Sequence, residues 1–192
     1  MIRKTNLRAD QKEIEMEIKI QKELSTDYTA IEKVIVEAFL NEEYSDKKEH
    51  LLVNRIRKSE AYIPQLSLIA LKGDKDVIGH ILLSKIKIIN GDHAVDSLAL
   101  APVSVIPEYQ NKGIGSQLIH TALKRAKDLG YRSVIVLGHK DYYSKFGFKP
   151  ASLWNIQAPF EVPDEVFRAL ELTPGSLENV QGVVQYSKAF AE

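Results

Sequence analysis

A strand, a short polar loop and an amphipathic helix follow one another in the middle of the chain, and this junction limits the possible folds most strongly. Residues 95–106 are mostly apolar and are typical of a strand that ends at a proline, and residues 108–112 are polar. From Gly113 to Leu129 apolar residues recur at helical spacing, and Gly130 is a typical helix terminator. The helix must bury its apolar stripe against a sheet, so a domain of helix and sheet layers is expected.

The helix start that follows this loop is suited to bind a phosphate group. The first-turn N–H groups of a helix have no partner within the helix, and the helix dipole favours an anion there. Gly113 and Gly115 keep side chains away from those N–H groups, while Lys112 adds a positive charge and Ser116 adds a hydroxyl. We call residues 110–116 the phosphate loop and predict that it binds a pyrophosphate. The alternative interpretation is that the two glycines serve only the geometry of the helix entry.

Two other phosphate-binding patterns do not fit this loop. A dinucleotide fingerprint requires a third glycine three residues after Gly115, where this chain has Leu118. The Gly-Lys-Ser/Thr sequence of a Walker loop is also missing. A nucleotide-binding domain of either kind is therefore disfavoured.

Further strands and helices are expected around this junction. Alternating or continuous apolar runs predict strands at 16–20, 66–71, 77–89, 133–137 and 182–186, with Phe148 starting another strand region. Helices are expected after the capping residues Thr26 and Asp27, after the capping residue Ser45, over 141–146, and from Pro163 through Val166, Phe167 and Leu170. Because strands and helices mix on one sheet, the predicted fold class is α+β (mixed α/β).

Composition excludes several classes of protein. The 192 residues suit one domain, which we expect to span residues 16–192 behind a polar, flexible extension of residues 1–15. Charges balance at 26 Lys and Arg against 26 Asp and Glu, which gives no reason to expect nucleic acid or an anionic membrane as a partner. Uncharged stretches such as 97–107 are too short to span a bilayer, and no signal peptide is evident, so a cytoplasmic location is expected. The chain has no cysteine, which excludes disulfides, a thiolate nucleophile and cysteine-ligated metals.

Two motifs resemble those of the GNAT acetyltransferase superfamily. Gln110-Asn111-Lys112-Gly113-Ile114-Gly115 resembles the Gln/Arg-x-x-Gly-x-Gly/Ala signature, which binds the pyrophosphate of acetyl-CoA in that family. Residues 141–148, Asp-Tyr-Tyr-Ser-Lys-Phe-Gly-Phe, resemble the later Tyr-x-x-x-Gly-Phe element of the same family. Segments 136–139, 162–175 and 182–190 resemble the YhbS-like branch of N-acetyltransferases, so the similarity covers roughly residues 16–190.

The resemblance implies a central mixed, mostly antiparallel sheet flanked by helices, with splayed strands that hold acetyl-CoA as a cosubstrate. It implies that pantetheine lies along the strand that holds Val103, Ser104 and Val105, and that the N–H of Val103 stabilises the oxyanion. By motif position the cofactor-binding residues also include Tyr143, Phe146 and the phosphate loop, that is Gln110, Asn111, Lys112, Gly113, Ile114, Gly115 and Ser116.

Tyr143 is the candidate general acid. The resemblance places it near the thioester sulfur, and a phenol with an ordinary pKa near 10 is protonated at pH 7 and can donate to the leaving thiolate. The alternatives are that Tyr143 only packs in the core, and that the neighbouring Tyr142 forms core or a substrate wall.

The base that removes the proton of the incoming ammonium is not identified by sequence. Candidates are Glu37, Glu42, Glu43, Asp96, His93 and His139, and a chain of waters is an alternative. His139 is the best placed of these by its position after the apolar strand. The four histidines other than His139, which are His50, His80, His93 and His120, show no metal-ligand spacing, so no metal is predicted.

The sequence leaves two possible functions open. The first is an acetyl-CoA-dependent N-acetyltransferase that transfers acetyl directly to a primary amine of a small molecule or peptide. The second is a non-catalytic acyl-CoA-binding or regulatory module on the same fold. Acceptor identity is open, and so is a homodimer formed through the apolar C-terminal segment with Val183, Val184, Tyr186 and Phe190.

Overall fold

The structure is a computed structural model that describes residues 17–43 and 45–191. The expected extension of residues 1–15 lies outside the described residues. Within them the strands are β1 Ile18–Lys22, β2 Ser67–Lys72, β3 Asp76–Asn90, β4 His93–Val105, β5 Ser133–Leu137, β6 Lys149–Pro150, β7 Ile156–Gln157, β8 Phe167–Glu171 and β9 Gly182–Gln185. The helices are α1 Tyr28–Phe39, α2 Glu49–Arg57, α3 Ile114–Asp128 and α4 Lys140–Tyr143.

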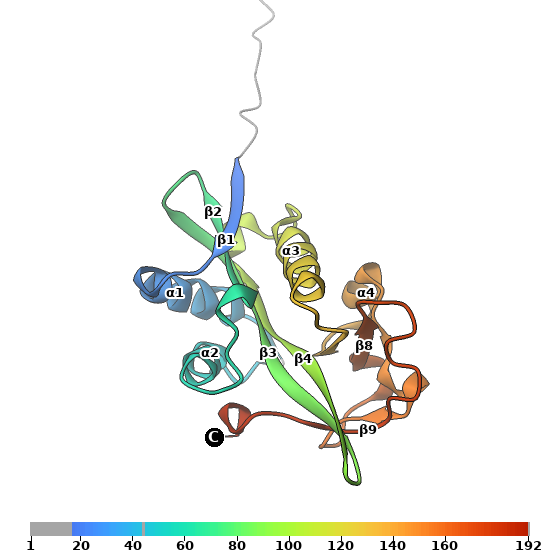
Figure 1. The fold of residues 1–192 in the computed structure, drawn as a ribbon. Coiled ribbons are helices and arrows are strands. Elements are labelled where there is room, and N and C mark those ends of the chain that lie inside the picture. The colour runs from blue at the N-terminus through green and yellow to red at the C-terminus, as the bar shows by residue number, and fades with distance from the viewer. Residues whose placement is uncertain (1–16, 44, 192) are drawn as a thin grey trace, which may run out of the picture.

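One mixed, mostly antiparallel sheet organises these elements, as expected. The strand order is β1-β2-β3-β4-β5-β8-β6, with β9 added to β3 and β7 added to β9. Only the β4–β5 and β7–β9 pairs are parallel among the described strands. Helices α1 and α2 cover one face and α3 covers the other (Figure 1). No helix in the described part of the chain is long and apolar enough to cross a membrane.

The long β3–β4 hairpin contains a bulge that bends β4. Ile81 pairs with Val103 and Leu83 pairs with Leu100, so β4 holds one residue more than β3 between these pairs. The bulged segment contains Pro102, which has no N–H to donate to a neighbouring strand.

Strand β4 pairs with β5 over only two residue pairs, Leu98 with Val134 and Ala99 with Ile135. Beyond them, no described strand pairs with the side of residues 100–105 that faces away from β3. We call this side the open edge of β4. The splayed strands that the resemblance implied are therefore present.

The two faces of the sheet bury separate apolar clusters. On the α3 face, Leu118 and its helix neighbours pack on residues such as Leu83, Leu98 and Val134. Helix α3 approaches β3 closely, because a Cβ at Gly79 would come within 3.0 Å of the Leu118 side chain. On the opposite face α1 and α2 pack on β2, β3 and β4, and the C-terminal segment reaches the same cluster through Phe190.

Two of the predicted helix positions are wrong. Residues 167–171 form β8, not the helix expected from Pro163, and only 164–166 make a 3-10 turn. Phe167 and Ala169 pack on one face while Arg168 is buried on the other, where its guanidinium donates to the Ser144 hydroxyl and the Phe148 carbonyl. Strand β8 is therefore covered on both faces, and its buried arginine interrupts the apolar run that would have predicted such a strand.

The helix expected to begin at Ser45 begins four residues later, at Glu49. Lys47 has φ 62, a left-handed conformation that no helix can include. The Ser45 hydroxyl instead accepts from the Lys47 N–H and donates to the Glu49 carboxylate. The strand expected to start at Phe148 is short, spanning only Lys149–Pro150.

Candidate active site

The phosphate loop leads from the open edge of β4 to the start of α3. A 3-10 turn over Pro107–Tyr109 comes first, and the Gln110 side-chain amide donates to the Val105 carbonyl at 3.0 Å. Asn111 and Gly113 both have positive φ values, of 60 and 79. Gly113 is the N-cap of α3 and provides no side-chain cap, so the first-turn N–H groups of this 15-residue helix are available to an anion.

Two lysines lie beside the phosphate loop, and sequence analysis found only one of them. The Lys112 ammonium lies 5.0 Å from the centre of the Tyr109 ring. Lys72, at the end of β2, donates to the Tyr109 hydroxyl at 2.7 Å, and this hydrogen bond raises the pKa of Lys72. Lys72 is 37 residues from Tyr109 in sequence, so no local pattern links it to the loop. Together the two ammonium groups place positive charge beside the loop, although the carboxylates of Asp76 and Glu108 also act on Lys72.

Tyr142 lies against the first turn of α3. A Cβ added at Gly115 would come within 2.8 Å of the Tyr142 hydroxyl. Burial raises the pKa of Tyr142, and a hydrogen bond with Ser116 opposes that shift. The absence of a side chain at Gly115 is thus needed for this contact. Tyr142 lies at the phosphate loop, a position that the core and substrate-wall alternatives considered above did not include.

Tyr143 is the last residue of α4, and its ring lies beside the end of β5. Its ring fills the space where a side chain at Gly138 would otherwise be, and it meets Phe148 edge to face at 5.7 Å. Only 8% of Tyr143 is exposed, and burial raises its pKa, so the phenol is protonated at neutral pH. Within the described residues no hydrogen-bond partner holds its hydroxyl. Phe146 is half-buried and packs edge to face on His120 of α3 and on Tyr142.

The direction of the backbone groups of β4 follows from its pairing with β3. The Ile106 N–H donates to the Ile78 carbonyl on β3 at 3.0 Å. Successive N–H groups of a strand point to opposite sides. The Ser104 N–H therefore also points to β3, while the N–H groups of Val103 and Val105 point to the open edge. The side chains of Val103 and Val105 pack on the α3-face core. The N–H of Val103 is therefore available at the open edge.

Two of the candidate bases, Asp96 and His93, lie away from this edge. Asp96 is exposed, pairs with Lys87 at 2.9 Å, and precedes Val103 by seven residues, about 20 Å along an extended strand. His93 is still farther away along β4. Glu37 is 3.7 Å from Lys33 on α1, and Glu42 and Glu43 are exposed after that helix. His139 is exposed at the start of α4, next to the glycine that contacts Tyr143.

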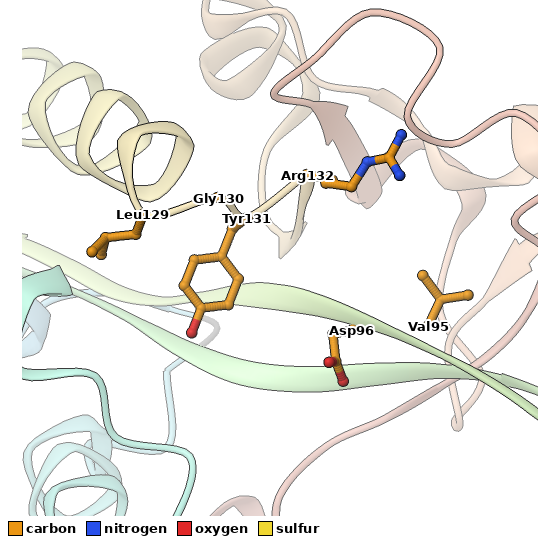
Figure 2. A pocket seen from close by; sticks show the side chains of 6 residues that line it. All are labelled: Val95, Asp96, Leu129, Gly130, Tyr131 and Arg132. Atoms are coloured by element: carbon orange, nitrogen blue, oxygen red, sulfur yellow. The ribbon is translucent and has the colours of Figure 1, made fainter.

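Two surface hollows lie outside the phosphate loop. One of about 280 Å³ is at the C-terminal end of α3, where Tyr131 extends toward β4 near Val95 and Asp96 while Arg132 points away (Figure 2). This hollow lies at the opposite end of β4 from Val103. The second, of about 300 Å³, lies beside the start of β8 and includes Phe160, Glu161, Asp164 and Phe167 in its lining.

In the described part of the chain no group of three or more His, Asp or Glu side chains is placed to hold a metal ion.

A family model described as the acetyltransferase (GNAT) family matches residues 22–148, which is most of the chain and includes both the phosphate loop and Tyr143. The chain belongs to the GNAT acetyltransferase family. The family resemblance of the two motifs is thereby confirmed.

Individual relatives of this GNAT protein agree with that placement. The Escherichia coli K12 protein named "uncharacterized N-acetyltransferase YjhQ" is 37% identical over 119 residues, which are 62% of this chain and 65% of YjhQ. The chain thus matches less than two thirds of the length of YjhQ. Escherichia coli YhbS, also named an uncharacterized N-acetyltransferase, is 26% identical over 155 residues, 81% of this chain and 90% of YhbS.

Two solved structures resemble the GNAT fold described here. The crystal structure of Escherichia coli YhbS in complex with CoA has a TM-score of 0.80 at 24% identity, covering 92% of this chain and 93% of YhbS. A GNAT family acetyltransferase from Brucella melitensis, crystallised with acetyl-CoA, has a TM-score of 0.74 at 34% identity, covering 91% of this chain and 99% of that one.

Proposed function

We propose that this protein is an acetyl-CoA-dependent N-acetyltransferase that transfers acetyl directly to a primary amine of a small molecule or peptide. The observation that carries the proposal is the open edge of β4, which leads through a 3-10 turn and the phosphate loop to a helix N-terminus without a side-chain cap. A thioester with an extended amide arm and a pyrophosphate matches both features in that order. The family placement and the acetyl-CoA complex of the Brucella relative support the same cosubstrate.

Each part of acetyl-CoA has a counterpart in the chain. The N–H groups and Lys112 of the phosphate loop would hold the pyrophosphate. The backbone of Val103, Ser104 and Val105 would hold the pantetheine, with only the Val103 and Val105 groups turned to the open edge. The N–H of Val103 would donate to the thioester carbonyl, and Phe146 would contribute to the wall near the loop.

Tyr143 is proposed as the proton donor. The amine nitrogen forms the new bond to the acetyl carbon and gives up one proton to solvent, the carbon–sulfur bond breaks, and the thiolate takes the phenol proton, which the tyrosinate later regains from solvent. A buried phenol with a raised pKa stays protonated until that moment. Because the chain has no cysteine, an acetyl-cysteine intermediate is excluded and transfer occurs within one ternary complex.

The acceptor enters as a positively charged amine. The hollow beside β8 is lined by two carboxylates, Glu161 and Asp164, together with apolar residues, and its lining includes no Lys or Arg. It lies next to the end of β5, since the Gly138 N–H donates to the Val166 carbonyl at 2.9 Å. A protonated amine with an apolar body suits this lining.

Two measurements test the proposal. Isothermal titration with acetyl-CoA, CoA, ATP and NAD should show binding of the two CoA compounds; binding of ATP without CoA would contradict the acetyltransferase function. An assay of free thiol release with a panel of polyamines, amino acids and peptide N-termini should then show turnover. Tight CoA binding without turnover on any amine would instead favour the non-catalytic module.

A further inference from the structure

A cluster of buried polar side chains lies on the face of the sheet that α1 and α2 cover. Arg57 of α2 donates two hydrogen bonds to the Glu23 carboxylate, at 3.0 and 2.7 Å, and the Tyr62 hydroxyl donates a third at 2.7 Å. The Nε2 atom of His80 lies 3.2 Å from Glu23 and 3.1 Å from the Ser67 hydroxyl. His80 is fully buried, and Glu23 and Arg57 are almost fully buried.

The charge state of Glu23 determines which nitrogen of His80 carries the proton. Burial alone would raise the pKa of Glu23, but hydrogen bonds from His80, Arg57 and Tyr62 outweigh it and hold that pKa well below its usual range. Burial lowers the pKa of His80, so its imidazole is neutral. An ionised carboxylate only accepts hydrogen bonds, so Nε2 bears the hydrogen and Nδ1 carries the free lone pair.

That basic nitrogen has no partner in the described part of the protein. His80 Nδ1 is buried and makes no hydrogen bond, and the same holds for the hydroxyl of Ser104. Ser104 is the direct cross-strand partner of His80, so both side chains lie on one face of the sheet. Two adjacent, unsatisfied polar groups are the usual setting for one bridging buried water.

Ser104 connects this cluster to the candidate active site. It follows Val103, whose N–H points to the open edge, and it lies on β4 between that edge and His80 on β3. From the open edge the polar groups succeed one another across the sheet: Ser104 on β4, His80 on β3 and Glu23 just after β1. The hollow beside β8, proposed above for the amine, lies on this side of the sheet, because its lining residues Ile156 and Phe167 share one apolar cluster with Ala99, the cross-strand partner of Ser84.

We propose that Ser104 and His80, joined by one buried water, form the relay that takes the proton from the acceptor ammonium, and that Glu23 positions His80 for this role. The inference rests on the proposed function. The ammonium gives a proton to the Ser104 oxygen, Ser104 passes its own proton to the water, and the water protonates His80 Nδ1. Glu23 then faces an imidazolium, as in a carboxylate–histidine pair, while Arg57, which stacks on Tyr28 at 3.9 Å, and Tyr62 keep Glu23 in place. Ser67 completes the groups that face the ring.

Two amines of similar shape test the relay in the full-length protein. Ethylamine is protonated at pH 7 and must lose a proton before attack, whereas 2,2,2-trifluoroethylamine is uncharged at that pH. His80→Gln and Ser104→Ala should each lower kcat/KM for ethylamine by about 100-fold at pH 7. They should leave trifluoroethylamine nearly unaffected, and the ethylamine defect should shrink as the pH approaches the pKa of that amine.

Ser84→Ala is the matched control. Its hydroxyl is also buried without a partner among the described residues, and it lies on the same face of β3, opposite Ala99 on the other side of the bulge. It should leave the rates with both amines unchanged.

If His80→Gln lowers both rates equally, or if Ser104→Ala behaves like Ser84→Ala, the relay is wrong. If His80→Gln does not fold, Ser104→Ala decides alone. If the wild-type chain binds acetyl-CoA but acetylates neither these amines nor the panel, the proposed function itself is overturned.

Discussion

The two faces of the sheet are built from different kinds of side chain on either side of the same strands. The α3 face is a mostly apolar core in which Arg168 is a buried exception, and its candidate binding groups are backbone N–H groups at Val103 and at the helix start. The α1 and α2 face buries Glu23, Arg57 and His80 among apolar residues. The comparison teaches that the cosubstrate side needs shape and glycines, whereas the opposite side depends on particular charged side chains. Four measurements would sharpen or break this comparison.

The largest effect is expected on the charged face. Arg57→Met keeps much of the side-chain volume but leaves the buried Glu23 carboxylate without its arginine partner, and it should lower the free energy of unfolding by about 3 to 5 kcal/mol. Urea unfolding measures this loss. Lys87→Met breaks an exposed pair of similar length with Asp96 and should change stability very little. Equal small losses in both variants would contradict the contrast between the faces.

The next effect concerns catalysis at the end of β5. Tyr143→Phe should lower kcat by about 100-fold, because the leaving thiolate loses its proton donor, while acetyl-CoA affinity stays unchanged. Steady-state kinetics and titration calorimetry separate the two. Tyr131→Phe, at the hollow shown in Figure 2, removes a hydroxyl far from the phosphate loop and serves as the control. Wild-type turnover in Tyr143→Phe would show that this tyrosine only packs.

Lowering the pH should destabilise the protein through the buried His80 and Glu23 on the α1 and α2 face. Folding lowers the pKa of both His80 and Glu23, so at acidic pH the unfolded chain binds more protons than the folded chain, and stability falls as the pH falls. The loss should start below pH 6.5, the ordinary pKa of histidine, and continue below pH 4.5, that of glutamate. Urea unfolding from pH 8 to pH 4 measures it. His80→Gln should remove the portion between pH 6.5 and 4.5, and a wild-type stability that is flat over that range would contradict the assignment.

The smallest effect is expected on the backbone-built face. Lys112→Ala should weaken acetyl-CoA binding only a few-fold, about 1 kcal/mol or less, because most of the phosphate contacts come from N–H groups. The difference from wild type should shrink further at high salt. Lys127→Ala, at the other end of α3, is the control and should bind normally. A loss far larger than this would mean that side chains, not the backbone, hold the pyrophosphate.

Sequence patterns predicted elements built from neighbouring residues well and contacts between distant segments poorly. The phosphate loop, α3 and β5 follow from local signals, namely glycine positions, helical spacing and a β-branched run. Strand β8 was predicted as a helix because the buried Arg168 interrupts its apolar pattern. The relay was missed because Glu23, Arg57, His80 and Ser104 come from four separate segments of the chain. The place of Lys72 beside the phosphate loop was not predicted for the same reason. Contacts between distant segments carry no local pattern.

The bulge in β4 has a further consequence for the register of its side chains. Before it, the even-numbered Leu98 and Leu100 point into the α3-face core; after it, the odd-numbered Val103 and Val105 do. The extra residue therefore shifts the phase of the strand by one, which turns the Val103 N–H outward and brings Ser104 opposite His80 at the same time. Removing a single residue near Pro102 would undo both placements together, so the length of this segment is under tighter constraint than its composition.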